Sequence, residues 1–277
     1  MTLSGRNKIF RLGIFLSFLC LLICIFASVK AMSVYAPMEQ EIDRRSGGLF
    51  QILAGKLFET NLLAASWGIA GLVLYSFFSM ILIYYFFEKT QSPEIPFVTF
   101  FAASFSTEAL RLLLPLSHVY EIPSLYLLMA ARVTLFCRYF GIFALFAASL
   151  YAVGFKSQKQ RNVVLIIAVI TLIITLGVPI DTETWDSSLN MISGYASMFR
   201  LIEVGAFLIT VMSFFIAAWL RSLREFVFIG TGSVLTLLGR HILLSADTWA
   251  ALPIGLLLLT TGTWLICTKL HKIYLWL

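Results

Sequence analysis

Eight apolar runs, each about 20 residues long, account for most of the chain. A run of that length spans the hydrocarbon core of a bilayer as a helix, because only a helix or a closed barrel satisfies every backbone polar group there. The composition agrees, since 60% of the 277 residues are hydrophobic and 12% are charged, whereas soluble domains carry charge on about a quarter of their residues. We predict an all-α, polytopic helical membrane protein with eight transmembrane helices, at approximately residues 10–32, 61–87, 97–117, 123–154, 163–180, 196–220, 226–246 and 250–268.

Three regions follow one another along the chain. Residues 1–33 are expected to hold a cytoplasmic N-terminus and a first helix that is retained, because it is longer than the apolar core of a signal peptide, about 7–15 residues. Residues 34–60 form an outer loop, and residues 61–277 form a seven-helix bundle with a short cytoplasmic tail. Apolar residues at helical spacing in the loop predict a short amphipathic helix on the membrane surface or, alternatively, a lid over a pocket; they are Leu49, Phe50, Leu53, Leu57 and Phe58.

Lysine and arginine are distributed unevenly between the loops. Eleven basic residues lie at the two termini and in alternate loops, whereas the opposite loops hold four, together with nine acidic residues. Because loops rich in lysine and arginine stay in the cytoplasm, we predict that both termini are cytoplasmic and that the protein resides in a bacterial inner membrane. The same asymmetry explains the net charge of +6 without nucleic acid, for which basic and exposed aromatic residues should occur together.

The bundle shows a weak internal repeat. The segment from Thr107 to Ser117 aligns with residues 171–181 and, less closely, with residues 236–246, and a threonine precedes an arginine by four positions at Thr107 and again at Thr236. This pattern indicates a seven-helix bundle built of hairpin-like repeats, each with two helices joined by a short basic turn.

Charged residues inside the predicted helices are the main evidence about function. Each costs at least about 2.5–3.5 kcal/mol at bilayer depth and normally faces the protein interior. The predicted helices contain five arginines but two glutamates, and most of them lie in the outer half of the membrane. A guanidinium group binds carboxylate or phosphate through paired hydrogen bonds. The sequence therefore predicts an outward-facing pocket for a small anion or lipid headgroup; the alternative is a set of structural pairs and snorkelling side chains. The predicted pocket residues are Arg111, Arg132, Arg138, Arg240, Glu108, Glu203 and His241, and Arg200 is the fifth arginine.

The remaining residues carry no recognisable chemical motif. The sequence has no phosphate loop, no paired metal-ligand motif and no nucleophile beside a base, so neither an enzyme nor a cofactor is predicted. The four cysteines are expected to pack as small apolar residues rather than as a disulfide framework. His118 and His241 are expected to be polar groups at the outer interface, with a metal site or proton relay as the alternative.

The order of elements resembles the membrane module of bacterial seven-transmembrane DISM-type receptors. The resemblance covers the topology of residues 61–268 and the charged turn Glu88-Lys-Thr-Gln-Ser-Pro-Glu94, and it includes no diagnostic motif. The chain differs in having an outer segment of only about thirty residues and no output domain after Lys272. The resemblance implies a sensor whose ligand binds among the helices and whose output passes through a separate protein partner.

Two other functions fit the same residues. An organic-anion or lipid transporter should carry charges into the cytoplasmic half, where only Arg138 approaches, and should have broken helices, which are not expected here. A structural or assembly subunit of a membrane complex is favoured by the short loops. The sequence therefore favours an anion-binding sensor over both alternatives.

Overall fold

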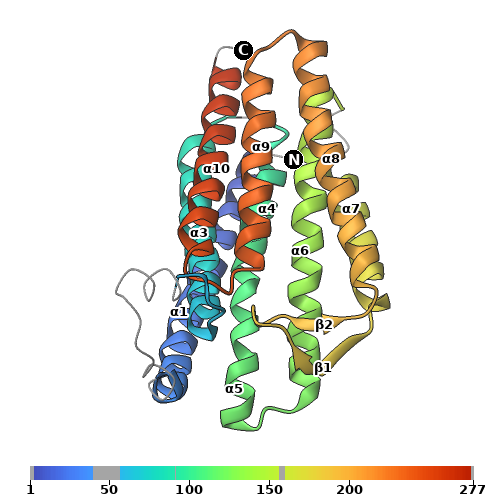
Figure 1. The fold of residues 1–277 in the computed structure, drawn as a ribbon. Coiled ribbons are helices and arrows are strands. Elements are labelled where there is room, and N and C mark those ends of the chain that lie inside the picture. Colours follow the sequence, from blue (N-terminus) through green and yellow to red (C-terminus); the bar gives the residue numbers. More distant parts are fainter. Residues whose placement is uncertain (1–2, 40–56, 91, 156–159, 276–277) are drawn as a thin grey trace.

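The computed structural model describes residues 3–39, 57–90, 92–155 and 160–275, and these form a helical bundle with a small β-hairpin at one end (Figure 1). The helical elements are α1 (Leu3–Glu39), α3 (Leu62–Phe87), α4 (Ile95–Ser104), the 3-10 helix η1 (Phe105–Leu112), α5 (Leu113–Tyr120), α6 (Ser124–Val153), α7 (Gln160–Gly177), α8 (Ala196–Arg221), α9 (Glu225–Leu244) and α10 (Ala251–Leu275). The two strands are β1 (Ile180–Trp185) and β2 (Met191–Ser193).

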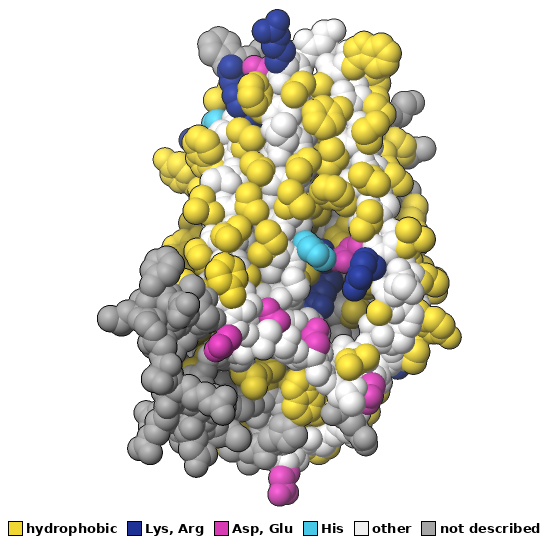
Figure 2. Space-filling view, viewed as in Figure 1, with side chains coloured by type: hydrophobic (Ala, Val, Ile, Leu, Met, Phe, Trp, Pro, Cys, Tyr) yellow, Lys and Arg dark blue, Asp and Glu magenta, His cyan; other side chains and the backbone are white. Residues whose placement is uncertain are grey.

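Within these described ranges, eight helical segments are long and apolar enough to cross a membrane, which confirms the predicted number. Their outer surfaces are apolar as well, since Trp219 is 84% exposed and Leu201 is 72% exposed. Figure 2 shows hydrophobic side chains over most of the face that α8, α9 and α10 form. An apolar surface of this extent is compatible with a multi-pass membrane protein.

The spans surround a buried central segment. The third span, formed by α4, η1 and α5, is the most buried of the eight; it packs against α1, α3 and α6. α3 also contacts α10, α10 pairs with α9, α9 with α8, and α8 with α6, while α7 packs on the outside of α6. The charged residues of the third span therefore lie in the middle of the protein.

The first and the last helix both extend beyond their predicted C-terminal ends. α1 continues to Glu39, six residues into the segment expected to be an outer loop, and α10 continues to Leu275. The predicted amphipathic helix lies mostly in residues 40–56, outside the described residues. Of its apolar positions, Leu57 and Phe58 are described, and both are exposed.

The prediction of unbroken helices is wrong for the third span. α4 ends at Ser104, and η1 continues as a 3-10 helix to Leu112. The hydroxyls of Ser104, Ser106 and Thr107 donate to carbonyl oxygens three residues earlier, at 2.7–2.8 Å, and such bonds compete with the α-helical ladder. Pro115 in addition has no N–H for the carbonyl four residues before it. The aligned Thr236–Arg240 segment stays α-helical in α9, so the two repeat positions differ in geometry.

The prediction of a purely helical chain is wrong between α7 and α8. β1 and β2 form an antiparallel hairpin in which Ile180 faces Ser193 and Trp185 faces Met191. The predicted fifth span extended to residue 180, but α7 ends at Gly177, because Pro179 disfavours a helical conformation in the residue before it. The hairpin turn, residues 186–190, reaches the buried charges of the third span.

α9 and α10 pack with their backbones almost in contact. A Cβ atom added to Gly239 would lie 2.6 Å from the Leu259 nitrogen, and one added to Gly262 would lie 2.6 Å from the Gly232 oxygen. The glycines recur seven residues apart on each helix, at 232 and 239 and at 255 and 262. Glycine therefore sets the distance between these two helices.

The last turns of α10 lie at the end of the bundle opposite the hairpin (Figure 1). Arg6, which is 5% exposed, donates to the carbonyl oxygens of Phe87 at 2.6 Å and Glu88 at 3.3 Å, and it thereby satisfies the C-terminus of α3. Near the other chain end, the Tyr274 hydroxyl donates to both carboxylate oxygens of Glu94, at 2.9 and 2.7 Å. Glu94 is fully buried and also accepts a bond from Ser92 at 2.7 Å.

Glu94→Gln is expected to stabilise the protein at high pH. Burial raises the pKa of the Glu94 carboxyl above its usual 4.5, although its hydrogen bonds and Arg221 act in the opposite direction. The folded state therefore holds this proton more tightly, so the stability of the wild type falls as pH rises from about 4.5 through the raised pKa. Thermal unfolding in detergent at pH 5 and pH 8 should show an advantage of the variant that grows with pH. An advantage that is constant with pH, or that shrinks, contradicts the assignment.

Candidate functional site

A buried ion cluster joins the third and fourth spans. Glu108 is fully buried; its Oε2 accepts from Arg111 Nη1 at 3.1 Å and from Arg138 Nη2 at 2.6 Å, and its Oε1 accepts from Arg138 Nε at 2.7 Å. Glu108 and Arg111 lie three apart in η1, and a 3-10 helix superimposes residues at that spacing. The sequence predicted this pair, and the structure adds Arg138 of α6 to it.

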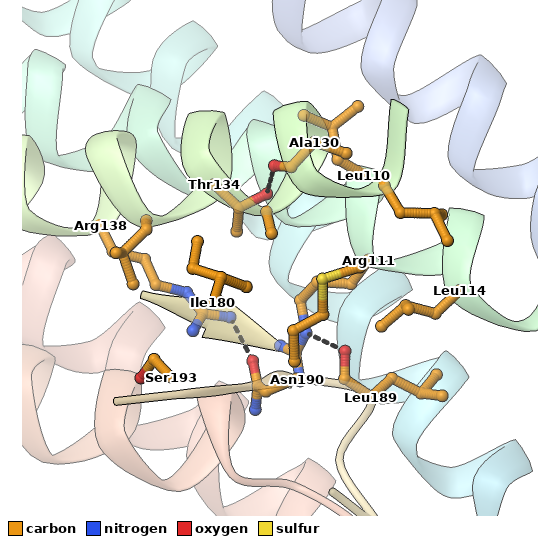
Figure 3. A pocket seen from close by; sticks show the side chains of 14 residues that line it. Leu110, Arg111, Leu114, Ala130, Thr134, Arg138, Ile180, Leu189, Asn190 and Ser193 are labelled. Carbon is orange, nitrogen blue, oxygen red and sulfur yellow. Dashed lines mark hydrogen bonds between the residues drawn. The ribbon is translucent and has the colours of Figure 1, made fainter. Parts of the chain in front are cut away.

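The turn of the hairpin completes the cluster. Arg111 donates to the main-chain oxygens of Ser188, of Leu189 at 3.4 Å and of Leu244 at 3.2 Å. Arg138 Nη2 donates to Asn190 Oδ1 at 2.7 Å. Figure 3 shows both arginines directed toward Leu189 and Asn190 from opposite sides of a small pocket. Neutral acceptors therefore occupy positions that the sequence interpretation assigned to an anion at Arg111.

The turn holds this shape through its own polar side chains. Asp186 Oδ1 accepts from the backbone N–H groups of Ser188 at 3.1 Å and Asn190 at 2.8 Å. Leu189 has a positive φ of 61° and is 1% exposed, so its side chain is inserted into the bundle beside Ala109 and Leu112. Sequence reasoning missed this turn, although Asp, Ser and Asn are typical turn residues.

The pocket between the hairpin, α6 and η1 is small. Its volume is about 50 Å³, and it is lined by Arg111, Arg138 and Asn190 together with apolar residues such as Leu114, Leu127 and Ile180. The two arginines that line this pocket already bind protein acceptors, so this part of the predicted anion site is occupied by the protein itself.

A second ion pair lies beside the first cluster. Arg240 Nη1 donates to Glu203 Oε1 at 2.6 Å, which joins α9 to α8. Arg240 is 4% exposed, and its buried Nη2 has no hydrogen-bond partner among the described residues. Arg138, Tyr139 and His241 lie within electrostatic range of Glu203.

This second pair lies at an open part of the protein. Figure 2 shows basic, acidic and histidine side chains gathered at a hollow in the otherwise apolar face between α8 and α9. Glu203 is 30% exposed by its side chain, and His241 and Arg200 are exposed. Three guanidinium groups, those of Arg111, Arg138 and Arg240, face the carboxylates of Glu108 and Glu203. Asp186 of the adjoining turn adds a third carboxylate within electrostatic range of Arg111.

The remaining predicted residues are not brought together. Arg132 lies on α6 with a buried Nε that has no partner in the described part of the chain, and it does not line the pocket near Arg138. His241 is on α9, while the side chain of His118 is outside the described residues. The four cysteines are free thiols. Among the residues that the structure describes, no group of three or more metal-ligating side chains occurs.

Comparison with protein-family models, with curated proteins and with solved structures finds no match to this chain. The functional interpretation therefore depends on the geometry of the two ion clusters.

Proposed function

We propose that this chain is a multi-pass membrane protein, with both termini cytoplasmic, that acts as a receptor-like sensor for an anionic group. The anion binds in the outer half of the bundle at Arg240, with Arg138, Arg200 and His241 nearby. The output passes to a separate protein partner. The eight apolar helices and the basic residues on alternate loops support the membrane topology.

The observation that carries the proposal is the unpaired nitrogen of Arg240. An unsatisfied charged donor in a buried position costs more than the loss of an ordinary hydrogen bond. Arg240 Nη2 is buried and has no partner among the described residues, whereas its ion-pair partner Glu203 is 30% exposed by its side chain. A phosphate or carboxylate at Nη2 provides the missing acceptor.

Two variants with opposite expected effects test this site. The purified protein is titrated with inorganic phosphate, and binding is measured as thermal stabilisation in detergent. Arg240→Gln is expected to weaken phosphate binding at least tenfold, because a charge-assisted bond contributes about 1.5–3 kcal/mol. Glu203→Gln is expected to strengthen binding, because the carboxylate that competes for Arg240 is removed.

Arg224→Gln serves as the matched control, since Arg224 is exposed at the opposite end of α9. It should bind phosphate like the wild type. If Glu203→Gln weakens phosphate binding or leaves it unchanged, the Arg240–Glu203 ion pair is structural and the proposed anion site is contradicted. If the wild type shows no stabilisation by phosphate, the same titration with acetate tests a carboxylate site, and no stabilisation by either anion overturns the proposal.

The broken third span favours a second candidate, an organic-anion or lipid transporter. Transporters bind substrate at interrupted helices, and η1 interrupts the third span at the position of Glu108 and Arg111. Uptake of labelled phosphate into proteoliposomes distinguishes the two functions. Flux above that of empty vesicles, abolished by Arg240→Gln, supports the transporter, whereas binding without flux supports the receptor.

A further inference from the structure

α7 and α8 both pack on α6. Between them is an apolar groove of about 540 Å³, with walls that include Val163 and Ile170 of α7, Phe143 and Leu150 of α6, and Ile209 of α8. A second cavity of about 290 Å³ continues it toward the hairpin end and shares Ile202 with it. The groove thus follows α7 from Val163 to Gly177, which is about 21 Å at 1.5 Å per residue.

The lining excludes water as the occupant. All residues around the larger cavity are hydrophobic or glycine, and a buried water needs two to four polar partners. The groove is also long enough for one lipid chain, because half of a hydrocarbon core is about 15 Å. An apolar chain of that length fits both the chemistry and the dimensions.

The groove is open to the outside of the bundle. Ile166 and Ile170 of α7 and Ile209 of α8 line the larger cavity and are 53%, 46% and 55% exposed. Because the exposed faces of these helices meet lipid in a membrane-spanning bundle, an acyl chain is the apolar group that enters the groove from this side.

Two glycines in the walls of the groove leave it deep because they have no side chains. A Cβ atom added to Gly205 or Gly177 would have no atom within 4 Å, so neither glycine is required by a neighbouring element. Gly205 lies in the wall of the larger cavity, and Gly177 lies in the wall of the smaller one. A side chain at either position would extend into the space that a ligand uses.

We infer that this groove is a binding site for one hydrocarbon chain of a membrane lipid. The inference rests on the proposed membrane insertion but is independent of the anion site at Arg240. α7 is held by α6 along one side, and the bound chain supplies the packing on the side facing α8. The ligand class is an amphiphile with a linear acyl chain.

A photoactivatable lipid tests the inference. The protein is reconstituted in vesicles of phosphatidylethanolamine and phosphatidylglycerol that contain phosphatidylglycerol with a diazirine near the end of one acyl chain. After illumination, labelled peptides are expected from residues 143–150 and 202–209. Gly205→Trp, which fills the groove, is expected to reduce this labelling at least fivefold. Leu208→Trp is the control, because Leu208 is 54% exposed on the outer face of the same helix.

Each outcome decides the question. Equal labelling of Gly205→Trp and Leu208→Trp, or labelling of all helices in proportion to exposure, overturns the inference. A change from dimer to monomer in Gly205→Trp without loss of labelling identifies a contact between copies instead. Should Gly205→Trp not fold, Ile170→Trp fills the groove from α7. Absence of the wild type from the membrane fraction contradicts the proposed function itself, whereas membrane insertion and phosphate binding without groove labelling contradict only this inference.

Discussion

Glu108→Gln is expected to lower the free energy of unfolding by about 3–5 kcal/mol, the usual cost of removing one partner from a buried ion pair. The side chain is fully buried and accepts three hydrogen bonds from Arg111 and Arg138. Glutamine keeps the shape but removes the charge, so two buried guanidinium groups lose the carboxylate that forms an ion pair with each of them. Unfolding in detergent, followed by heat or denaturant, measures the loss.

Two further variants separate charge from packing in this test. Glu225→Gln breaks an ion pair with Lys272, whose side chain is 55% exposed. Its free energy of unfolding should equal that of the wild type, because exposed ion pairs contribute little to stability. The double variant Glu108→Gln with Arg138→Gln removes one of the uncompensated charges and should be more stable than Glu108→Gln alone. A single variant as stable as the wild type would show that the carbonyl oxygens alone hold the arginines.

Gly262→Ala is expected to destabilise the protein by about 1–3 kcal/mol, and Gly262→Val by more. The added Cβ would lie 2.6 Å from the Gly232 oxygen and 2.7 Å from the Thr236 nitrogen. Both are backbone atoms, so α9 and α10 must move apart, and the contacts along the pair are lost. Arg240 is on α9, so its bond to Glu203 should be disturbed as well.

Gly205→Ala is the matched control for this substitution. It replaces a mid-helix glycine that has open space beside it, and it is expected to leave stability unchanged or to raise it by about 0.5–1 kcal/mol through better helix propensity. Thermal unfolding of the two alanine variants gives the comparison. Equal stabilities would mean that α9 and α10 can separate without cost.

The number and position of the helices were predictable because apolar length alone determines a membrane span. The sequence placed α6 and α8 within about one residue of their observed ends. It did not predict η1, because the interruption arises from hydroxyl groups that bond to the backbone, and Ser104, Ser106 and Thr107 also occur in continuous helices. Nor did it predict the hairpin, whose short strands are stabilised by contacts with the bundle rather than by their own pattern.

The candidate site was predictable in its residue types but not in its pairing. Helical spacing indicated that Glu108 and Arg111 form a pair, and the structure shows it at 3.1 Å. Spacing gave no information about pairs between helices, so Arg138 with Glu108 and Arg240 with Glu203 required the fold. Counting charges also overestimated the need for an anion, because main-chain oxygens of the turn and of α9 serve Arg111.

The eclipsed Glu108–Arg111 pair has a consequence for biosynthesis. The other acceptors of Arg111 are synthesised 77, 78 and 133 residues later. At about 5–20 residues per second, the last of them follows Arg111 after about 7–27 s. Arg138 of α6 is synthesised early in that interval, whereas the hairpin and α9 come only later. The 3-10 geometry places Glu108 directly over Arg111. The nascent third span therefore carries its own counter-charge for Arg111 before the later acceptors are synthesised.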